Sequence, residues 1–194
     1  MTTTEPPTRH PTGFAPLDAL LRGGLPRGGV AMLVGGVGVG KSTLFAQCAA
    51  GALYVGCDEV SSTVATRVAL VGGRFDAARF RSAATLTEAL RAVASTDLPC
   101  VLVDGAQELG RTVFTVVHAL REAARVANVA VLVAFERAAP VPEAEHAADV
   151  ALRLTRDPPP SHDHRLALTK YRAAPSAVIA LRLTRAGFVA AGAA

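Results

Sequence analysis

A glycine-rich segment at residues 35–42, which reads GGVGVGKS, limits the folds open to this chain more than any other part of it. The apolar run VAMLV precedes it, and residues 41–50 follow without proline or glycine, so the pattern predicts a strand, a loop and a helix. The spacing fits G-x-x-x-x-G-K-[ST], a loop whose backbone N–H groups surround phosphate oxygens. Glycines are needed because side chains would obstruct the inward-pointing amides. The segment therefore predicts a P-loop, which binds the phosphates of a nucleotide.

The residues of this loop are the candidate nucleotide-binding residues. They are Gly35, Gly36, Val37, Gly38, Val39, Gly40, Lys41, Ser42 and Thr43. We expect Lys41 to reach the β- and γ-phosphates of a nucleoside triphosphate and the Ser42 hydroxyl to ligate Mg²⁺. The helix that begins at Lys41 adds the positive end of its dipole to the same site.

A second metal residue is predicted at the end of the apolar run CVLVD, residues 100–104. Such a run is typical of a buried strand, and Asp104 would lie at its carboxyl end. On its own, an Asp in that place commonly caps a helix or forms a turn. Because this one follows a P-loop in the chain, we expect its carboxylate to hold the magnesium shell opposite Ser42.

Two acidic residues are candidates for orienting the water that attacks the nucleotide. Asp58 and Glu59 follow the predicted strand at residues 52–55, and the carboxyl ends of parallel strands share one edge of a sheet. Either carboxylate could serve. The alternative is that both are acids in the first turn of the next helix, which is predicted at residues 61–71.

The apolar pattern predicts alternating strands and helices, followed by strands alone. A long helix is predicted from Arg111, and its apolar face comprises Val113, Val116, Val117, Leu120 and Ala124. The last third holds the strand-like runs DVALRLT, RLALTKYR and AVIALRLT, with GFVA as a candidate continuation. We predict an α/β fold with a mixed, mainly parallel sheet flanked by helices and with antiparallel C-terminal strands. Residues 1–11 are predicted as a flexible tail and residues 12–194 as the domain.

Composition excludes several classes of protein. The longest apolar stretch is far shorter than the roughly 18 residues of a membrane-spanning helix, and the N-terminus resembles no secretory signal, so a cytoplasmic location is expected. The three cysteines match no zinc or redox spacing and are predicted to be reduced, mostly buried thiols. The net charge of +4 is only a weak indication of a nucleic-acid partner.

The segment TGFAPLDALLRGGLPRGGVAMLVGGVGVGKSTL resembles the start of the RecA-like core of the bacterial RadA/Sms family, which are branch-migration ATPases of recombination. The segments YVGCDE, VLVDGAQ, EHAADVALRL and LTKYR resemble later blocks of that core in the same order. The resemblance therefore covers nearly everything from Thr12 onward. It implies a RecA-like P-loop NTPase that hydrolyses ATP with Mg²⁺ at the interfaces of a homo-oligomer, a ring or a filament, with single-stranded DNA as its partner.

The resemblance also implies roles for four residues. Asp58 aligns with the catalytic glutamate of the family and Glu59 with the acid after it. Lys170 and Arg172 align with the KNRFG motif, whose basic groups approach the γ-phosphate held by the neighbouring subunit and stabilise the charge of phosphoryl transfer. The alternative for Lys170 and Arg172 is the exposed face of a strand.

Several departures from the family limit what the resemblance implies. Asp58 is one methylene shorter than glutamate, and neither the zinc module nor the Lon-like domain of the family is expected in this chain. The two segments that correspond to DNA-facing loops are short, with Arg111 beside the first and Arg137 in the second, the Pro-broken AFERAAPVPEAEH. A KaiC-like signalling ATPase that responds to nucleotide and ignores DNA is therefore the alternative. No sequence feature indicates a protein partner.

One further segment is considered for metal binding. In PPPSHDHR, the sequence His162-Asp163-His164 is predicted to be a polar turn between strands rather than a metal site, because no other ligand clusters with it.

Overall fold

The computed structural model describes residues 8–159, 161 and 163–191. Its strands are β1 (Arg9–His10), β2 (Leu25–Pro26), β3 (Val30–Gly35), β4 (Leu53–Gly56), β5 (Phe80–Ser82), β6 (Cys100–Asp104), β7 (Ala130–Glu136), β8 (Val150–Arg156), β9 (His164–Tyr171), β10 (Ala177–Thr184) and β11 (Gly187–Ala190). Its helices are α1 (Ala15–Leu20), α2 (Lys41–Cys48), α3 (Ser61–Leu70), α4 (Leu86–Ser95), α5 (Val113–Ala127) and α6 (Pro142–Ala147), with 3₁₀ turns η1 (Ala77–Arg79) and η2 (Ala106–Leu109).

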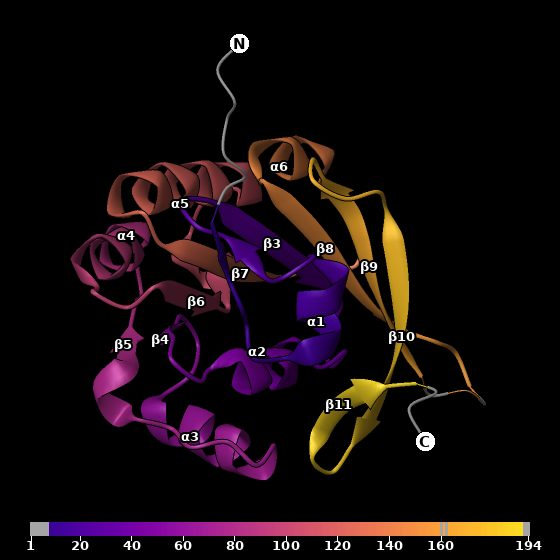
Figure 1. Ribbon diagram of the computed structural model, residues 1–194. Helices are drawn as coiled ribbons and strands as arrows, with labels where there is room; N and C mark the ends of the chain where they lie inside the picture. The colour runs from indigo at the N-terminus through magenta and orange to yellow at the C-terminus, as the bar shows by residue number, and fades with distance from the viewer. Residues whose placement is uncertain (1–7, 160, 162, 192–194) are drawn as a thin grey trace.

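Nine of these strands form one sheet in the order β11-β10-β9-β8-β3-β7-β6-β4-β5 (Figure 1). All pairings from β8 to β5 are parallel, and those among β8, β9, β10 and β11 are antiparallel. This confirms the predicted α/β fold with its mainly parallel sheet. The change to antiparallel pairing follows from the short connections near the C-terminus, which have no room for a crossover helix.

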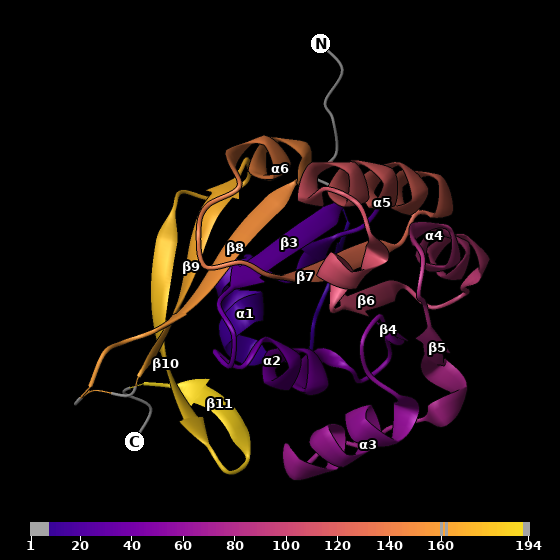
Figure 2. The ribbon, with the colours of Figure 1, turned by 180° about the vertical axis from the view of Figure 1, so that it is seen from behind.

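Helices cover both faces of the parallel part of the sheet (Figures 1 and 2). Alternate side chains of β3 point to opposite layers, as strand geometry requires. Leu33 packs in the same cluster as Phe45 of α2, whereas Met32 packs in the cluster that contains Leu120 of α5. Every residue of β3 and β6 is buried, which explains why these strands read as continuous apolar runs.

The predicted apolar face of the long helix is correct. All five residues of that face are buried in α5. The helix begins after Thr112, whose side chain accepts a hydrogen bond from the backbone N–H of Thr115, and ends at Asn128 in the left-handed conformation. Among the described residues, no helix has both the length and the apolar character needed to cross a bilayer.

Part of the segment predicted as a tail is packed against the domain, while the boundary at Thr12 stays a prediction. Residues 1–7 lie outside the described residues, but Arg9–His10 forms β1, which pairs antiparallel with β2. The Arg9 side chain donates a 2.7 Å hydrogen bond to the carbonyl oxygen of Leu21, and its guanidinium lies 5.1 Å from the centre of the Tyr171 ring. No sequence pattern indicated this pairing, because two residues are too few to show a strand period.

Two C-terminal segments also differ from the prediction. AFERAAPVPEAEH contains a helix, α6, which begins at Pro142 because proline is tolerated in the first turn, where its missing N–H is not needed. GFVA does not extend β10 but turns back on it as β11, and Gly187 supplies the turn with a φ of +97°.

The three cysteines are free thiols, as predicted. Cys48 and Cys100 are buried and Cys57 is half-buried. Burial raises the pKa of Cys48 and of Cys57 to about 12, so both remain protonated at neutral pH.

His164 does not lie in a polar turn, and His162 lies outside the described residues. His164 begins β9 with 2% of its surface exposed, and its ring meets the Phe188 ring edge-on with 5.0 Å between their centres. Within the described part of the chain, neither ring nitrogen has a hydrogen-bond partner. Burial lowers the pKa of His164, and Arg156 lowers it further, while Asp163 and Asp157 oppose the shift. A neutral imidazole is therefore packed into the core at the cost of two unsatisfied polar atoms.

We expect His164→Phe to raise the free energy of unfolding by about 1 kcal/mol at about pH 8, because it removes these atoms and keeps an aromatic ring against Phe188. The gain should grow as pH falls. Below about pH 6.5, His164 binds a proton in the unfolded chain but stays neutral in the folded chain, whose His164 pKa is lower. Between these two pKa values the free energy of unfolding of the parent therefore falls as the pH falls. Urea unfolding between about pH 8 and about pH 5 measures both effects.

The control is His118→Phe, which makes the same substitution at an exposed position of α5 and removes no buried polar atoms, so it should not give the gain in stability expected at about pH 8. An equal pH dependence in the parent and in His164→Phe would show that His164 is not protonated differently in the two states.

Candidate nucleotide-binding site

The P-loop joins the carboxyl end of β3 to the start of α2, and glycine is required in it for conformation and for space. Gly38 and Gly40 have φ values of +68° and +93°, which other residues rarely adopt. At Gly35, a Cβ atom would lie 2.7 Å from the carbonyl oxygen of Leu154 in β8. Gly40 caps α2 without any side-chain hydrogen bond, so the first N–H groups of the helix remain open to an anion.

The C-terminal hairpin packs against the P-loop and supports it. The sequence did not predict this contact. A Cβ atom on Gly40 would lie 2.6 Å from Cζ of Phe188 in β11, so the ring packs directly against the loop. The Gln47 side chain of α2 donates to the carbonyl oxygen of Phe188 and accepts from its N–H, both at 2.9 Å. These contacts fix the hairpin β10–β11 on the helix that follows the P-loop.

Lys41 reaches back over the loop from the first turn of α2. Its ammonium donates to the carbonyl oxygens of Gly35 at 3.0 Å and Gly36 at 2.8 Å. Burial lowers the pKa of Lys41, and the carboxylates of Glu136, Asp104 and Asp58 oppose the shift. The ammonium therefore lies at the loop among acidic groups, where a bound phosphate would add further negative charge.

The two predicted metal residues are brought together. Ser42 and Asp104 line the same cavity, and the Tyr54 hydroxyl donates to Asp104 Oδ2 at 2.6 Å. Asp104 is 3% exposed, and burial raises its pKa, although the hydrogen bond from Tyr54 and the nearby Ser42 hydroxyl lower it. Burial and the neighbouring Asp104 raise the pKa of Tyr54 well above its ordinary value, so the phenol keeps its proton.

This oxygen donor set suits Mg²⁺, which prefers carboxylate, hydroxyl, phosphate and water ligands. Over the described ranges, no group of three or more His, Cys, Asp or Glu could hold a metal ion by itself. Ser42 and Asp104 are therefore suited to a magnesium ion that arrives with a nucleotide, whose phosphate oxygens complete its coordination.

Asp58 and Glu59 face different partners. Asp58 lines the same cavity as Lys41 and Asp104, and partial burial raises its pKa, with further contributions from Asp104 and Glu59. Glu59 instead forms a two-pronged ion pair with Arg67 of α3, in which Arg67 Nη2 lies 2.6 Å from Glu59 Oε1 and Nη1 bonds to Oε2. Of the two acids, Asp58 is the one that faces the cavity.

The cavity measures about 300 Å³ and lies at the carboxyl edge of the parallel strands. It is lined by Gly38, Gly40, Lys41, Ser42, Thr43, Asp58, Arg67, Asp104, Gly105, Gln107, Glu136 and Leu183. Five of these residues were not predicted from the sequence: Arg67, Gly105, Gln107, Glu136 and Leu183. Glu136 could have been found, because it ends the next buried strand at the same edge, and its N–H donates to Gln107 Oε1 at 3.1 Å. No local signal marked Arg67 or Leu183, which tertiary packing brings to the site.

Lys170 and Arg172 lie away from this cavity. Lys170 pairs with Ala151 near the start of β8, whereas the P-loop follows the far end of the neighbouring β3. The Lys170 ammonium donates to the carbonyl oxygens of Glu145, His146 and Ala148 at 2.8, 2.8 and 2.7 Å, which uses all three of its donors at the end of α6. Burial lowers its pKa.

Arg172 follows β9 and is exposed, and its side chain has no hydrogen bond or ion pair to any described residue. The structure thus gives Lys170 a role in ending α6 that the sequence did not predict. A role for either residue toward a neighbouring subunit stays a prediction.

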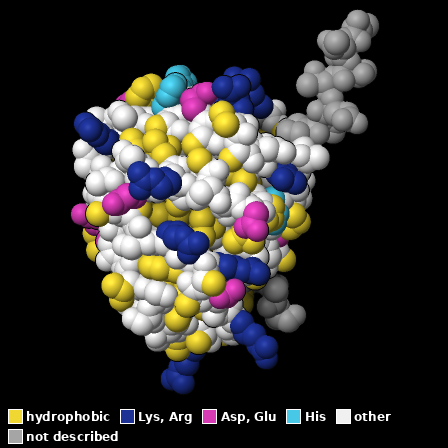
Figure 3. Space-filling view, turned by 90° about the vertical axis from the view of Figure 1, so that its left-hand side faces the viewer, with side chains coloured by type: hydrophobic (Ala, Val, Ile, Leu, Met, Phe, Trp, Pro, Cys, Tyr) yellow, Lys and Arg dark blue, Asp and Glu magenta, His cyan; other side chains and the backbone are white. Residues whose placement is uncertain are grey.

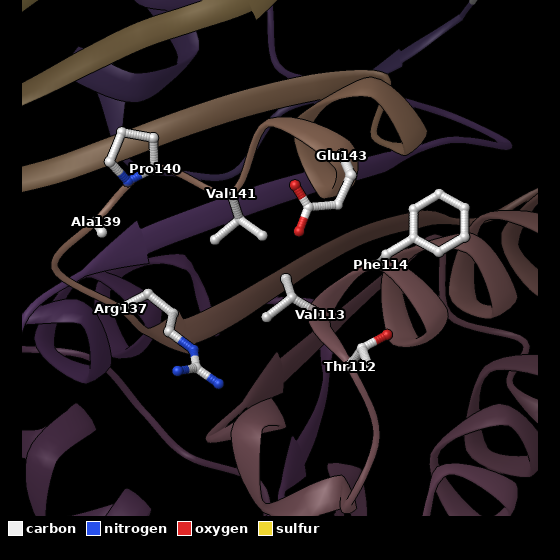
Figure 4. Close-up of a pocket in the computed structure, with 8 residues that line it drawn as sticks. All are labelled: Thr112, Val113, Phe114, Arg137, Ala139, Pro140, Val141 and Glu143. Atoms are coloured by element: carbon white, nitrogen blue, oxygen red, sulfur yellow. The ribbon is translucent and has the colours of Figure 1, made fainter.

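A larger cavity of about 680 Å³ lies elsewhere, between the start of α5 and the segment that joins β7 to α6 (Figure 4). It is lined by Thr112, Val113, Phe114, Arg137, Ala139, Pro140, Val141 and Glu143. None of the predicted catalytic or metal residues lies in it. Arg137, a candidate DNA contact, is its one cationic residue, and the rest of the lining is mainly apolar.

The sheet order and the glycine-rich loop that joins β3 to α2 together define a P-loop α/β fold of the RecA-like type. The chain belongs to DUF7125, a family of unknown function, whose model matches residues 9–192.

Two known proteins are similar to this chain. The crystal structure of a KaiC-like protein from the hyperthermophilic archaeon Pyrococcus horikoshii OT3 superposes with a TM-score of 0.79 and 18% identity, over 96% of this chain and 100% of that one. The DNA repair protein RadA of Mycolicibacterium smegmatis is 34% identical over 113 residues, and the match covers 54% of this chain. The chain spans only 24% of the length of that RadA.

Proposed function

We propose that this protein binds ATP with Mg²⁺ at the P-loop cavity and hydrolyses it. The observation that carries the proposal is the convergence of Lys41, Ser42, Asp58 and Asp104 on one cavity at the end of an open P-loop helix. In this proposal Lys41 and the loop amides bind the β- and γ-phosphates, and Ser42 and Asp104 hold the magnesium ion.

Asp58 is the proposed group that orients the attacking water, because it faces the cavity and Glu59 is engaged by Arg67. Magnesium supplies charge that stabilises the phosphoryl oxygens during transfer. The cation of Lys41 and the N–H groups of α2 act on the same oxygens, and the protein walls of the cavity limit screening by water. Because the Asp58 side chain is shorter than that of glutamate, the attacking water would have to lie closer to the backbone at the end of β4.

The first test separates binding from hydrolysis. We expect Lys41→Ala to abolish turnover and to weaken nucleotide binding strongly while the far-UV circular dichroism stays that of the parent. Asp58→Asn should keep binding and lower turnover about 10²-fold or more, because it removes only the group that orients the water.

Glu59→Gln is the matched variant, since it alters the adjacent acid whose carboxylate bonds to Arg67. A greater loss of turnover in Glu59→Gln than in Asp58→Asn would transfer the catalytic role to Glu59. Unchanged ATP hydrolysis by pure Lys41→Ala would show that the P-loop is not the site of hydrolysis.

We further propose that the protein couples ATP hydrolysis to movement along, or remodelling of, single-stranded DNA, as in a motor core of recombination or repair. The partial likeness to a DNA repair protein and the net charge of +4 support this role. A specific observation favours the alternative, a KaiC-like switch that ignores DNA: η2 follows β6 almost directly and α6 occupies much of the segment after β7, which leaves little loop for DNA.

The arginines near β5 do not add a clear basic surface. Arg79 pairs with Asp76 at 3.5 Å, and Arg81 donates to nearby carbonyl oxygens. Figure 3 shows basic side chains interspersed with apolar and acidic ones over that side of the molecule.

A salt series distinguishes the two roles. If the protein acts on DNA, the affinity for a single-stranded oligonucleotide should fall steeply with salt, with a logarithmic slope of roughly −0.7 per phosphate contact, and should change when a non-hydrolysable ATP analogue is added. Arg137→Ala should reduce the slope, whereas Arg125→Ala, on the exposed part of α5, serves as the charge-matched control. Nucleotide binding without any measurable DNA affinity would favour the switch.

We also propose that the active form is a homo-oligomer, a ring or a filament in the cytoplasm, in which Arg172 reaches the nucleotide of the neighbouring subunit. Its exposure and lack of partners among the described residues support this role. Lys170 would first have to leave three carbonyl oxygens, so Arg172 is the better placed of the two.

Mixing two inactive variants tests the role of Arg172. Arg172→Ala should bind ATP normally but hydrolyse it about 10³-fold more slowly, the lower end of the effect of a trans-acting arginine. Lys41→Ala retains Arg172 and should restore part of the activity when mixed with Arg172→Ala. Full activity in Arg172→Ala, or turnover per chain that does not depend on protein concentration, would mean that each subunit hydrolyses alone.

A further inference from the structure

Tyr54 is a buried residue of β4 whose hydroxyl points at the proposed magnesium residue. It is 1% exposed, and its hydroxyl donates to Asp104 Oδ2 at 2.6 Å. In the parallel pairing of β4 with β6, Gly56 lies opposite Asp104 and Tyr54 lies opposite Leu102. Tyr54 and Asp104 are therefore two positions apart on the same face of the sheet, a separation that a tyrosine side chain spans.

Two aromatic rings hold the Tyr54 ring in place. Phe80 of β5 stacks on it with ring centres 6.2 Å apart and planes at 21°, and Phe45 of α2 meets it edge-on at 6.3 Å and 78°. Phe45 belongs to the helix that follows the P-loop. The direction of the hydroxyl is thus fixed by packing between the P-loop helix and the edge strand, before any ligand binds.

The surroundings of Asp104 explain why such a donor is needed. Ser42 of α2 also lines the cavity with Asp104, but its hydroxyl is the one expected to turn to magnesium. Other charged groups near Asp104 are Lys41 of α2, Asp58 and Glu59 after β4, and Arg67 of α3. Among the described residues, Tyr54 is the side chain that donates a hydrogen bond to the Asp104 carboxylate, and a buried carboxylate without a donor would turn toward other partners.

We propose that Tyr54 is a positioning residue that holds the Asp104 carboxylate in the orientation that receives the magnesium ion of the bound nucleotide. The proposal rests on the function proposed above. It predicts that Tyr54 affects the part of nucleotide binding that depends on magnesium and leaves phosphate binding by the loop unchanged. Groups that orient metal-binding side chains commonly act in this way.

The test uses Tyr54→Phe, which keeps the ring between Phe45 and Phe80 and removes only the hydroxyl. The affinity for a fluorescent ATP analogue is measured first in excess EDTA and then during a Mg²⁺ titration. We expect unchanged affinity in EDTA, and a Mg²⁺ concentration for half-maximal effect that rises about tenfold, the lower end of the effect of removing an orienting group.

Tyr171→Phe is the matched control, because Tyr171 is the other of the two tyrosines and its hydroxyl contacts Arg9 outside the cavity. It should behave as the parent in both measurements. In an Asp104→Asn background, Tyr54→Phe should have no further effect on the Mg²⁺ dependence, since the two residues act as one unit.

The outcomes separate this proposal from the one on which it depends. A parent protein that binds no nucleotide in either condition overturns the proposed function and this inference with it. A parent with Mg²⁺-dependent binding and a Tyr54→Phe variant with the same dependence overturns the inference alone. An equal loss of affinity with and without Mg²⁺, together with a lower melting temperature, would show that the hydroxyl only stabilises the fold, which also overturns it.

Discussion

Burial of the parallel strands on both faces decides where chemistry can occur in this molecule. Along β3 and β6 no residue reaches solvent, so polar side chains can gather only where the strands end. Lys41, Asp104 and Glu136 follow or end three different strands and meet at one edge for this reason. In β7 the only exposed residue is Glu136, the last one.

The sequence predicted those parts of the fold and site that local chemistry determines. The P-loop, the strand that ends at Asp104 and the apolar face of α5 each carry a pattern within a few residues, and the structure bears out their secondary structure. The proximity of Ser42 and Asp104 was also predictable, because carboxyl ends of parallel strands share an edge. The family resemblance added the assignment of Asp58, which the geometry of the cavity favours over Glu59 without testing its role.

What the sequence did not indicate depends on contacts between distant segments. Tyr54 looked like one more apolar position in a buried strand, and only the pairing of β4 with β6 shows that its hydroxyl reaches Asp104. Lys170 aligned with a motif, yet the end of α6 takes all of its donors, and α6 itself was hidden by prolines that indicated a loop. His164 was placed in a polar turn because its neighbours are polar, but β9 begins one residue after Asp163 and turns the ring inward.

The contact between Phe188 and Gly40 also bears on the order in which the molecule can be completed during synthesis. The P-loop leaves the ribosome well before the strand that packs beneath it, because Gln47 and Phe188, which hold the two together, are 141 residues apart in the chain. Contacts so distant in sequence form late, because a long stretch of chain must be ordered before they are made. A nascent chain therefore carries an unsupported phosphate loop until β11 has been translated, and the pocket becomes complete only afterwards.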